Sequence, residues 1–300
     1  MATPFRLGLA FAIVYLVWGS TYLAIRVAVQ DVPPGLLAGL RFVMAGLVLT
    51  GFALLRHDKL PRGFDEWRAI LIMAVALVVI GNGVVHWAEQ YVASNLTALI
   101  ISGSALWTAW FGTFGRRGVP LVAGSRVGLA IGMVGVALLI WPEDQVGTHK
   151  TWALIGILCS SLTWSAGAIY GRTIQLELSP LMFAGTQMFV GGAILLGMGL
   201  IDGQMARVQW TLAGVGGMAY LTVFGSCLAY STYVWLIKHT TPARLATIAY
   251  VNPVVAAVLG WWLLDESLSR VQIAGTLIVL LGVVLVARFG RDQADHQGRR

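Results

Sequence analysis

Long apolar runs, each about 20 residues, alternate with short polar breaks along most of the chain. A bilayer-spanning α-helix needs about 20 mostly apolar residues, so each run predicts one membrane-spanning helix. Proline, glycine and charged residues mark the breaks, as in Pro33-Pro34 and in RHDKLPRGFDE at 56–66. The pattern predicts ten spans, at 7–29, 33–55, 67–91, 96–114, 124–141, 151–172, 180–201, 212–238, 243–264 and 270–288.

The same arrangement of residues occurs twice along the chain. Trp18 of WGSTYLAIR and Trp164 of WSAGAIYGR stand 146 residues apart, as do Pro34 and Pro180. Further matched pairs are Arg26 with Arg172, Gly46 with Gly192, Gly112 with Gly260, Gly128 with Gly275, and Gly135 with Gly282. We therefore predict two five-helix repeats at 1–143 and 144–290, followed by a cytoplasmic polar tail at 291–300. Duplicated membrane proteins commonly place a substrate site between their repeats.

Lysine and arginine predict the orientation in the membrane, because they accumulate in cytoplasmic loops. With both termini cytoplasmic, 15 of the 20 Lys and Arg residues lie inside, 4 lie outside, and Arg41 lies within a span. Five spans per repeat make the second repeat enter the membrane from the opposite side. The fold class predicted is thus an all-α integral membrane protein with ten helices in two inverted repeats.

Composition supports a polytopic membrane protein and excludes several other classes. Hydrophobic residues make up 58% and charged residues 11% of the chain, and the mean hydropathy is +0.79. In such a protein the net charge of +7 reflects topology and does not indicate nucleic-acid binding. Cys159 and Cys227 fall within apolar runs, which predicts packing roles and no disulfide. The apolar run that follows MATPFR continues past residue 20 without a small-residue cleavage site, so it predicts a retained first helix.

Glycine is abundant within the predicted spans, with 36 residues in the whole chain. Lipid provides no hydrophobic drive for helix association, so small residues that let backbones approach are expected to supply it. Gly128, Gly132 and Gly135 predict one such packing face. Gly81-Asn82-Gly83 in the third span admits a second interpretation, a weak point in the helix that bends during transport.

Ionisable residues are rare within the predicted spans. Arg41 lies in the second span, and His86 and Glu89 lie one turn apart near the outer end of the third. His86 and Glu89 could form a proton-responsive or substrate-steering pair, and Arg41 and Glu89 could act in gating or charge balance. A structural alternative pairs Glu89 with Arg41 or with a helix end. No Cys/His cluster with metal-ligand spacing occurs, so no metal or other cofactor is predicted.

Polar and aromatic residues near the membrane midplane predict the substrate site. Tryptophan belongs at membrane interfaces, so two repeat-related tryptophans at mid-span either find partners in the core or wall a cavity. Asn252-Pro253 is expected to interrupt the ninth span, whereas its repeat mate Ser104-Ala105 lacks the proline. An uncharged aromatic chamber suits a small amphipathic solute. The predicted substrate-binding residues are Trp18, Asn82, His86, Ser102, Trp107, Trp164, Gln187, Tyr230, Tyr250 and Asn252.

Four stretches resemble the EamA-type branch of the drug/metabolite transporter superfamily. They are WGSTYLAIR in the first span, WAEQYVASNLTALI across the third and fourth, P-x-R-L-A-T with N-P-V-V-A in the ninth, and DESLS before the tenth. The resemblance covers residues 7–288, and within this branch the chain is similar to YddG-type amino-acid exporters. It implies a bacterial inner-membrane carrier that moves small metabolites, often outward, through a cavity between the two halves.

The family pattern maps onto individual residues of this chain. Its Trp-Gly in span one falls on Trp18-Gly19, its Asn-Pro break on Asn252-Pro253, and its acidic residue after span nine on Glu266. The first half departs from the pattern, because Arg116-Arg117 stand where an acidic residue would follow span four. The first-half loop is therefore not expected to make the same contacts as the second.

These observations favour a secondary transporter that exports neutral or aromatic amino acids. It would work by alternating access of the two halves around a central aromatic and polar cavity. A broad-specificity drug/metabolite or nucleotide-sugar carrier of the same fold is the alternative, which only substrate profiling separates. An enzyme lacks a convergent catalytic set, a channel lacks a polar ring, and an ATP-driven pump lacks a P-loop. The expected partners are the lipid bilayer and a small-molecule substrate, with proton coupling left open and a monomer sufficient.

Overall fold

Helices form all the regular secondary structure in the part of the chain that the structure describes. The structure is a computed structural model that describes residues 3–114, 118–141, 147–240, 242–245 and 247–297. No strand occurs within these ranges, as predicted. The first half forms α1 (Pro4–Ala28), α2 (Pro34–Leu55), α3 (Phe64–Met73), η1 (Ala74–Gly83), α4 (Val84–Ala88), α5 (Ser94–Ser102), α6 (Ser104–Phe111) and α7 (Ala123–Leu139). The second half forms α8 (Thr148–Thr173), α9 (Pro180–Ile201), η2 (Gln204–Arg207), α10 (Leu212–Tyr220), η3 (Leu221–Leu228), α11 (Ala229–His239), α12 (Pro242–Leu245), α13 (Ile248–Leu264) and α14 (Arg270–Gln297).

Seven helical stretches are long and apolar enough to cross a membrane: α1, α2, the third span at 64–88, α8, α9, the eighth span at 212–237, and α14 up to Phe289. The predicted fourth, fifth and ninth spans are represented by shorter helices: α5 with α6, α7, and α13. The ten-helix count therefore remains a prediction. Helix α14 continues to Gln297, so most of the predicted polar tail is helical, and 298–300 lie outside the described residues.

Proline and hydroxyl side chains start several helices where the sequence predicts a boundary. Pro34 and Pro180 occupy the first turns of α2 and α9, where a backbone N–H has no helical partner in any case. The Ser179 hydroxyl accepts a hydrogen bond from the Met182 backbone N–H at 3.1 Å and thereby caps α9. These local preferences explain why the predicted limits of both helices agree with the structure.

The third and eighth predicted spans each change from α-helix to π-helix near the middle. Segment η1 follows α3 and includes Gly81-Asn82-Gly83, the stretch identified as a weak point. The Asn82 side-chain amide donates to the Leu77 carbonyl oxygen at 2.8 Å, which satisfies one acceptor of this wider helix. Segment η3 lies at the corresponding place in the second half, where no Asn marks it in the sequence. Single π-helical turns occur frequently at functional sites.

The ninth span lacks the interruption expected at its centre, and the fourth span is interrupted where no break was expected. Helix α13 continues through Pro253, so the expected break at Asn252-Pro253 is wrong. Proline removes only one N–H donor and leaves the rest of the helical hydrogen bonds intact when its ring is accommodated. The interruption in the first half falls at Gly103, between α5 and α6, where the sequence offers no proline.

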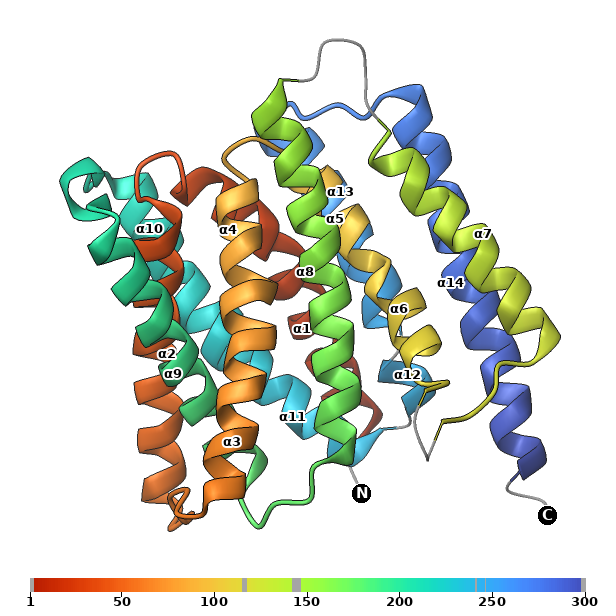
Figure 1. Ribbon diagram of the computed structural model, residues 1–300, viewed down its shortest axis with the longest axis horizontal. Helices are drawn as coiled ribbons and strands as arrows, with labels where there is room; N and C mark the ends of the chain where they lie inside the picture. Colours follow the sequence, from red (N-terminus) through yellow and green to blue (C-terminus); the bar gives the residue numbers. More distant parts are fainter. Residues whose placement is uncertain (1–2, 115–117, 142–146, 241, 246, 298–300) are drawn as a thin grey trace.

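Helices α2 and α9, which occupy equivalent places in the two halves, pack closely against each other (Figure 1). A Cβ atom on Gly46 would lie 2.4 Å from the Phe189 backbone nitrogen, and one on Gly192 would lie 2.5 Å from that of Val43. Real Cβ atoms do not approach so closely, so both glycines are required for this packing. The contact confirms that glycine brings these backbones together, as expected in lipid.

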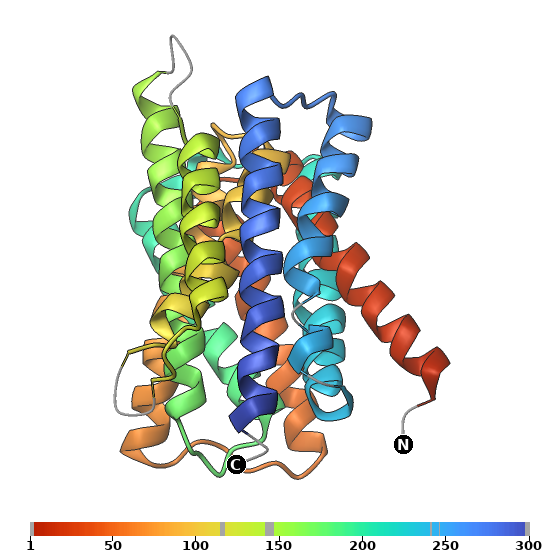
Figure 2. The same cartoon turned by 90° about the vertical axis from the view of Figure 1, so that its right-hand side faces the viewer.

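Helices α7 and α14, also equivalent in the two halves, lie side by side in both ribbon views (Figure 2). A Cβ atom on Gly282 would lie 2.5 Å from the backbone of Gly132, and one on Gly135 would lie 2.5 Å from the Val279 nitrogen. The predicted glycine face of α7 is therefore a helix-packing face.

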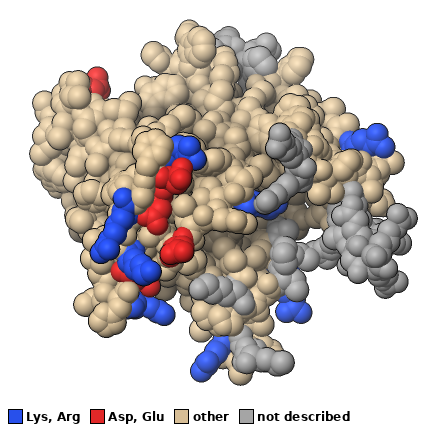
Figure 3. Space-filling model, turned by 60° about the horizontal axis from the view of Figure 1, so that its bottom comes forward, with Lys and Arg blue, Asp and Glu red and all other residues tan. Residues whose placement is uncertain are grey.

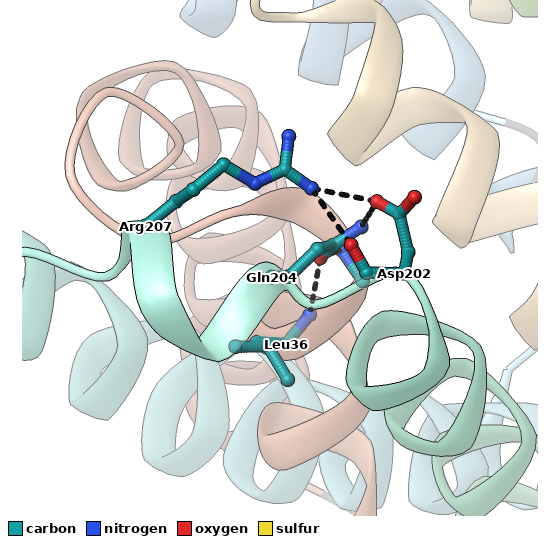
Figure 4. A network of polar contacts seen from close by, with 5 residues as sticks. Leu36, Asp202, Gln204 and Arg207 are labelled. Carbon is teal, nitrogen blue, oxygen red and sulfur yellow. Dashed lines mark hydrogen bonds and ion pairs between the residues drawn. The ribbon is translucent and has the colours of Figure 1, made fainter.

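Polar loop residues cap helix ends across the two halves. The Gln204 side-chain oxygen accepts hydrogen bonds from the backbone N–H groups of Gly35 at 3.0 Å and Leu36 at 3.2 Å (Figure 4). At the repeat-related position, the Asp58 carboxylate accepts a hydrogen bond from Ser179, the N-cap residue of α9. Each half thus stabilises the first turn of a helix in the other half.

Candidate functional site between the two halves

Trp18 lies in α1 and contacts the π-helical segment of the other half. Its indole N–H donates to the Gly225 carbonyl oxygen at 3.0 Å. The indole ring packs on Tyr233 of α11, with 5.1 Å between the ring centroids. The sequence left open whether Trp18 finds a partner or walls a cavity, and the structure shows that it has a partner at a carbonyl of η3.

Trp164 makes the reciprocal contact. It lies in α8, and a Cβ atom on Gly81 of η1 would come within 3.2 Å of the Trp164 ring. Ser160, one turn earlier in α8, donates a hydrogen bond to the Gly81 carbonyl oxygen. Trp164 is 40% exposed, so part of its ring remains free. Each repeat-related tryptophan therefore packs on the π-helical segment of the opposite half.

Arg41 is buried beside Trp18 and joins α2 to η3 and α4. Its Nε atom donates to the Ser226 hydroxyl at 2.9 Å. Ser226 directly follows Gly225, whose carbonyl oxygen accepts from Trp18. Its Nη1 atom lies 3.4 Å from Nε2 of His86. The other ring nitrogen of His86, Nδ1, lies 2.8 Å from the Asn82 carbonyl oxygen.

The hydrogen-bond partners assign the tautomer of His86. A carbonyl oxygen only accepts, so Nδ1 carries the proton and donates to Asn82. Arginine only donates, so Nε2 accepts from Arg41 and has no proton of its own. His86 is therefore the neutral imidazole in this arrangement.

Glu89 follows α4 and is fully buried. Within the described part of the chain, neither of its carboxyl oxygens has a hydrogen-bond partner. Its backbone carbonyl oxygen accepts a hydrogen bond from Arg26 of α1, the repeat mate of Arg172. The described residues form ion pairs only on the surface, so the pairing of Glu89 with Arg41 that the sequence offered is not formed. The alternative contact with a helix end involves the Glu89 backbone and not its carboxyl group.

Unlike Glu89, Glu266, the acidic residue after the ninth predicted span, has hydrogen-bond donors for its carboxylate. Its carboxylate accepts hydrogen bonds from the Ser94 backbone N–H at 2.8 Å, the Ser94 hydroxyl at 2.8 Å and the Asn95 backbone N–H at 3.0 Å. It thereby caps α5 in the other half. Arg116-Arg117, predicted to replace such an acidic residue in the first half, lie outside the described residues.

The other predicted site residues lie on several elements around this centre. Ser102 donates to the Leu99 carbonyl at 2.6 Å, and Trp107 is buried with no partner for its indole N–H among the described residues. The Asn252 side-chain oxygen is also without a partner within the described chain. Gln187 is buried on α9, Tyr230 packs on a core cluster of α2, η1 and α9, and Tyr250 packs on the cluster around Trp107.

Contacts join Trp18, Arg41, His86 and Asn82 into one polar centre, whereas among the described residues no such contact joins Ser102 or Gln187 to it. Ser226 and Tyr233 bond and stack within this centre and are not among the residues predicted from the sequence. One signal was present in the sequence: Tyr230 and Tyr233 are spaced by three residues, which places them on one helix face.

A surface pocket of about 420 Å³ lies elsewhere, at the end of the molecule that holds the chain termini (Figure 1). Lys59, Arg62, Glu66 and Glu177 are among its lining residues. Charges of both signs and open exposure do not distinguish it from an ordinary loop surface, so it is not assigned a ligand.

The sequence pattern of the EamA-like transporter family matches residues 6–141 and again residues 151–288. The chain belongs to this EamA-like transporter family. Two matches of similar length agree with the duplication found in the sequence. Together with the apolar helices, they indicate that this EamA-like protein is a multi-pass membrane protein of the transporter class.

Relatives of this EamA-like protein include several transporters. The uncharacterized inner membrane transporter YedA of Escherichia coli K12 is 37% identical over 281 residues, covering 93% of this chain and 89% of its own. A probable amino-acid metabolite efflux pump of the same bacterium is 25% identical over 300 residues and covers 93% of both chains. The WAT1-related protein At3g02690 of Arabidopsis thaliana is 24% identical and covers 91% of this chain and 67% of its own.

A solved crystal structure has the same fold as this EamA-like protein. It covers 97% of this chain and 99% of its own, with a TM-score of 0.65 and 17% sequence identity. At that identity the likeness supports the fold and does not extend to the substrate.

Proposed function

We propose that this protein is a secondary transporter that exports neutral and aromatic amino acids across a bacterial inner membrane. It works by alternating access of two inverted five-helix halves, at 1–143 and 144–290, around a site at their interface. The observation that most directly supports this proposal is the reciprocal packing of Trp18 on Gly225 and of Trp164 on Gly81.

The duplicated family match supports ten spans in two halves. The short helices α7 and α13 and the pair α5 and α6 then complete the seven longer stretches. Helices at equivalent places in the two halves pack together, as α2 does with α9 and α7 with α14. Inverted halves can exchange conformations, which gives a physical basis for opening the site to each side in turn.

The π-helical segments are suited to movement. Their wider turns leave carbonyl groups to be satisfied by other helices, as Ser160 does for Gly81 and Trp18 does for Gly225. Such bonds can be exchanged when one half rocks against the other. The contacts of Trp18 and Trp164 then change with the position of the opposite half, and both side chains line the substrate path.

Charge supports the proposed orientation. Lys and Arg side chains, with several Asp and Glu side chains among them, lie on the face that comes forward in Figure 3, which holds the termini end of the molecule. Arg56, Lys59, Arg62 and Arg68 follow α2 or begin α3 on this face. By the positive-inside rule it is cytoplasmic.

The proposed substrate follows from the chemistry of the centre and from the function named for one relative. Trp18, Tyr230 and Tyr233 offer aromatic faces, while Asn82, Ser226 and Asn252 offer neutral polar groups. A relative is named as a probable amino-acid metabolite efflux pump. A broad-specificity drug/metabolite or nucleotide-sugar-like carrier is the alternative that the experiment must separate.

The test is uptake into proteoliposomes of the purified protein, with labelled amino acids, nucleosides and sugars, each with and without a pH gradient. Saturable uptake of neutral or aromatic amino acids is the expected result. Flux of another solute class with no amino-acid flux would overturn the substrate assignment.

The pH gradient in the same experiment tests energy coupling. Uphill flux that stops when the gradient collapses indicates a proton-coupled carrier, whereas equilibration that ignores the gradient indicates a facilitator. Because His86 accepts from Arg41 and donates to Asn82, a proton-coupled cycle would have to rearrange these bonds.

A further inference from the structure

Arg41 and Glu89 are two buried ionisable side chains, one basic and one acidic, that do not pair with each other. Arg41 is 5% exposed and Glu89 is 0% exposed. Within the described residues neither forms an ion pair, and both oxygens of the Glu89 carboxyl group lack a hydrogen bond. Leaving buried charges without partners costs several kcal/mol per ion, and within a membrane such residues usually serve a function.

The partners of Arg41 are all neutral. Nε donates to the Ser226 hydroxyl, and Nη1 faces the imidazole of His86. These contacts hold the guanidinium group in place without neutralising it. A guanidinium fork is suited to a carboxylate, which it binds through two parallel hydrogen bonds.

The surroundings of Glu89 differ from those of a stabilising carboxylate in the same region. Glu266, which lies close enough to repel Glu89 electrostatically, has three donors at the start of α5. Glu89 has none, although Arg26 and Arg41 lie within electrostatic reach of its carboxyl group. Its two oxygens are therefore free to accept from a cationic donor that is not part of this chain.

Arg41 lies beside the aromatic centre. Arg41 bonds Ser226, and Trp18 bonds the adjacent residue Gly225, so the guanidinium group and the indole meet on the same turn of η3. If the apolar side chain of a bound amino acid packed on Trp18 and Tyr233, its α-carboxylate and α-ammonium groups would point toward Arg41.

We propose that Arg41 and Glu89 are the ionic subsite for a zwitterionic α-amino acid. The Arg41 guanidinium binds the substrate α-carboxylate, and the Glu89 carboxylate binds the substrate α-ammonium group. This proposal rests on the proposed function and specifies its substrate class. Both groups are buried in the described conformer, so the substrate reaches them through the opening of the two halves. A ligand with both charges neutralises the site, whereas one with a single charge leaves one buried ion unpaired.

Counterflow in proteoliposomes tests this subsite. Vesicles with wild-type protein are loaded with unlabelled phenylalanine, and exchange of labelled phenylalanine is measured against three external competitors. Phenylalaninamide lacks the carboxylate, 3-phenylpropionate lacks the ammonium group, and phenethylamine lacks the carboxylate but keeps the amine. Phenylalanine is expected to compete about tenfold or more better than each, because charged hydrogen bonds are lost with the others.

Two variants should change the preference in opposite ways. Arg41→Gln should make phenylalaninamide as good a competitor as phenylalanine while 3-phenylpropionate stays weak. Glu89→Gln should make 3-phenylpropionate as good as phenylalanine while phenylalaninamide stays weak. Arg68→Gln and Asp65→Asn make the same chemical changes in an exposed surface ion pair and should keep the wild-type preference.

The failures of the two proposals are distinguishable. Exchange of phenylalanine with equal competition by all four compounds would overturn the ionic subsite and leave the amino-acid transporter standing. No exchange of any amino acid would contradict both proposals. If either variant does not exchange, the shift of its thermal unfolding midpoint by added ligand reports the same preference. Phenylalanine is compared with phenylalaninamide for Arg41→Gln and with 3-phenylpropionate for Glu89→Gln, and a preference like that of wild type overturns the assignment.

Discussion

The Glu266 carboxylate binds Ser94 twice, through the backbone N–H and through the hydroxyl group, each at 2.8 Å. It joins the loop after α13 to the start of α5, which belong to different halves. A Cβ atom on Gly260 would lie 2.3 Å from this carboxylate oxygen, so a side chain there would displace the carboxylate. One end of the interface between the halves is therefore fastened by a helix cap.

Glu266→Gln should destabilise the protein by about 1 kcal/mol, since an amide keeps only one of the two accepting oxygens. Thermal unfolding of the purified variant in detergent measures this change. Asp265→Asn is the matched control, because Asp265 has a left-handed backbone, φ 52°, that Asn also tolerates. Equal stability of the two variants would show that the cap contributes nothing.

Gln204→Ala should remove the cap of α2 and lower stability by about 1 kcal/mol. The Gln204 side chain is the acceptor for two N–H groups of the first turn (Figure 4). Gln209→Ala, at an exposed position, provides the control. The prediction is wrong if both variants unfold at the wild-type temperature.

Acid should weaken the contribution of Asp202. Hydrogen bonds from Gln204 and then from Arg207 hold the pKa of the Asp202 carboxyl group below its ordinary value. A group with a lowered folded-state pKa stabilises above its unfolded pKa of about 3.9, and this stabilisation is lost as pH falls through the folded pKa. Wild type should therefore unfold at a higher temperature than Asp202→Asn at pH 6, and the difference should shrink below about pH 4. A difference that persists unchanged in acid would contradict this assignment.

Gly46→Ala and Gly51→Ala, two substitutions on α2, should have opposite effects. A methyl group on Gly46 would overlap the backbone of Phe189, and overpacking typically costs about 1–3 kcal/mol. A methyl group on Gly51 would meet nothing within 4 Å, so the alanine should stabilise the helix by up to about 1 kcal/mol. Thermal unfolding of both variants decides the point, and a stable Gly46→Ala variant would contradict the close packing of α2 on α9.

The sequence predicts most helix limits because apolar length and punctuation decide them locally. Pro34 and Pro180 start their helices within one residue of the expected positions. Prediction from the sequence fails where tertiary packing overrides a local signal. Pro253 is accommodated inside α13, and η3 is π-helical without a Gly-Asn-Gly stretch like that of η1.

The candidate site is only partly predictable for a related reason. Trp18, Arg41, His86 and Asn82 are unusual residues for mid-membrane positions and attract attention from the sequence alone. Ser226 and Tyr233 are ordinary in an apolar helix, and only the path of α11 and η3 past α1 and α2 brings them to the centre. The Glu266 carboxylate has hydrogen-bond donors and the Glu89 carboxyl group has none among the described residues. This difference depends on contacts between elements far apart in the chain, so the sequence does not reveal it.

The most direct test of the account is the rate of phenylalanine exchange by wild type, Trp18→Ala and Trp164→Ala in proteoliposomes, with Gly51→Ala as the control. Wild type and control should show saturable exchange. Both tryptophan variants should lose about tenfold or more of the exchange rate, with membrane insertion retained, since each loses its aromatic contact with the opposite half. Wild-type rates in both tryptophan variants, or no exchange by the wild-type protein, would contradict a substrate path between the two halves.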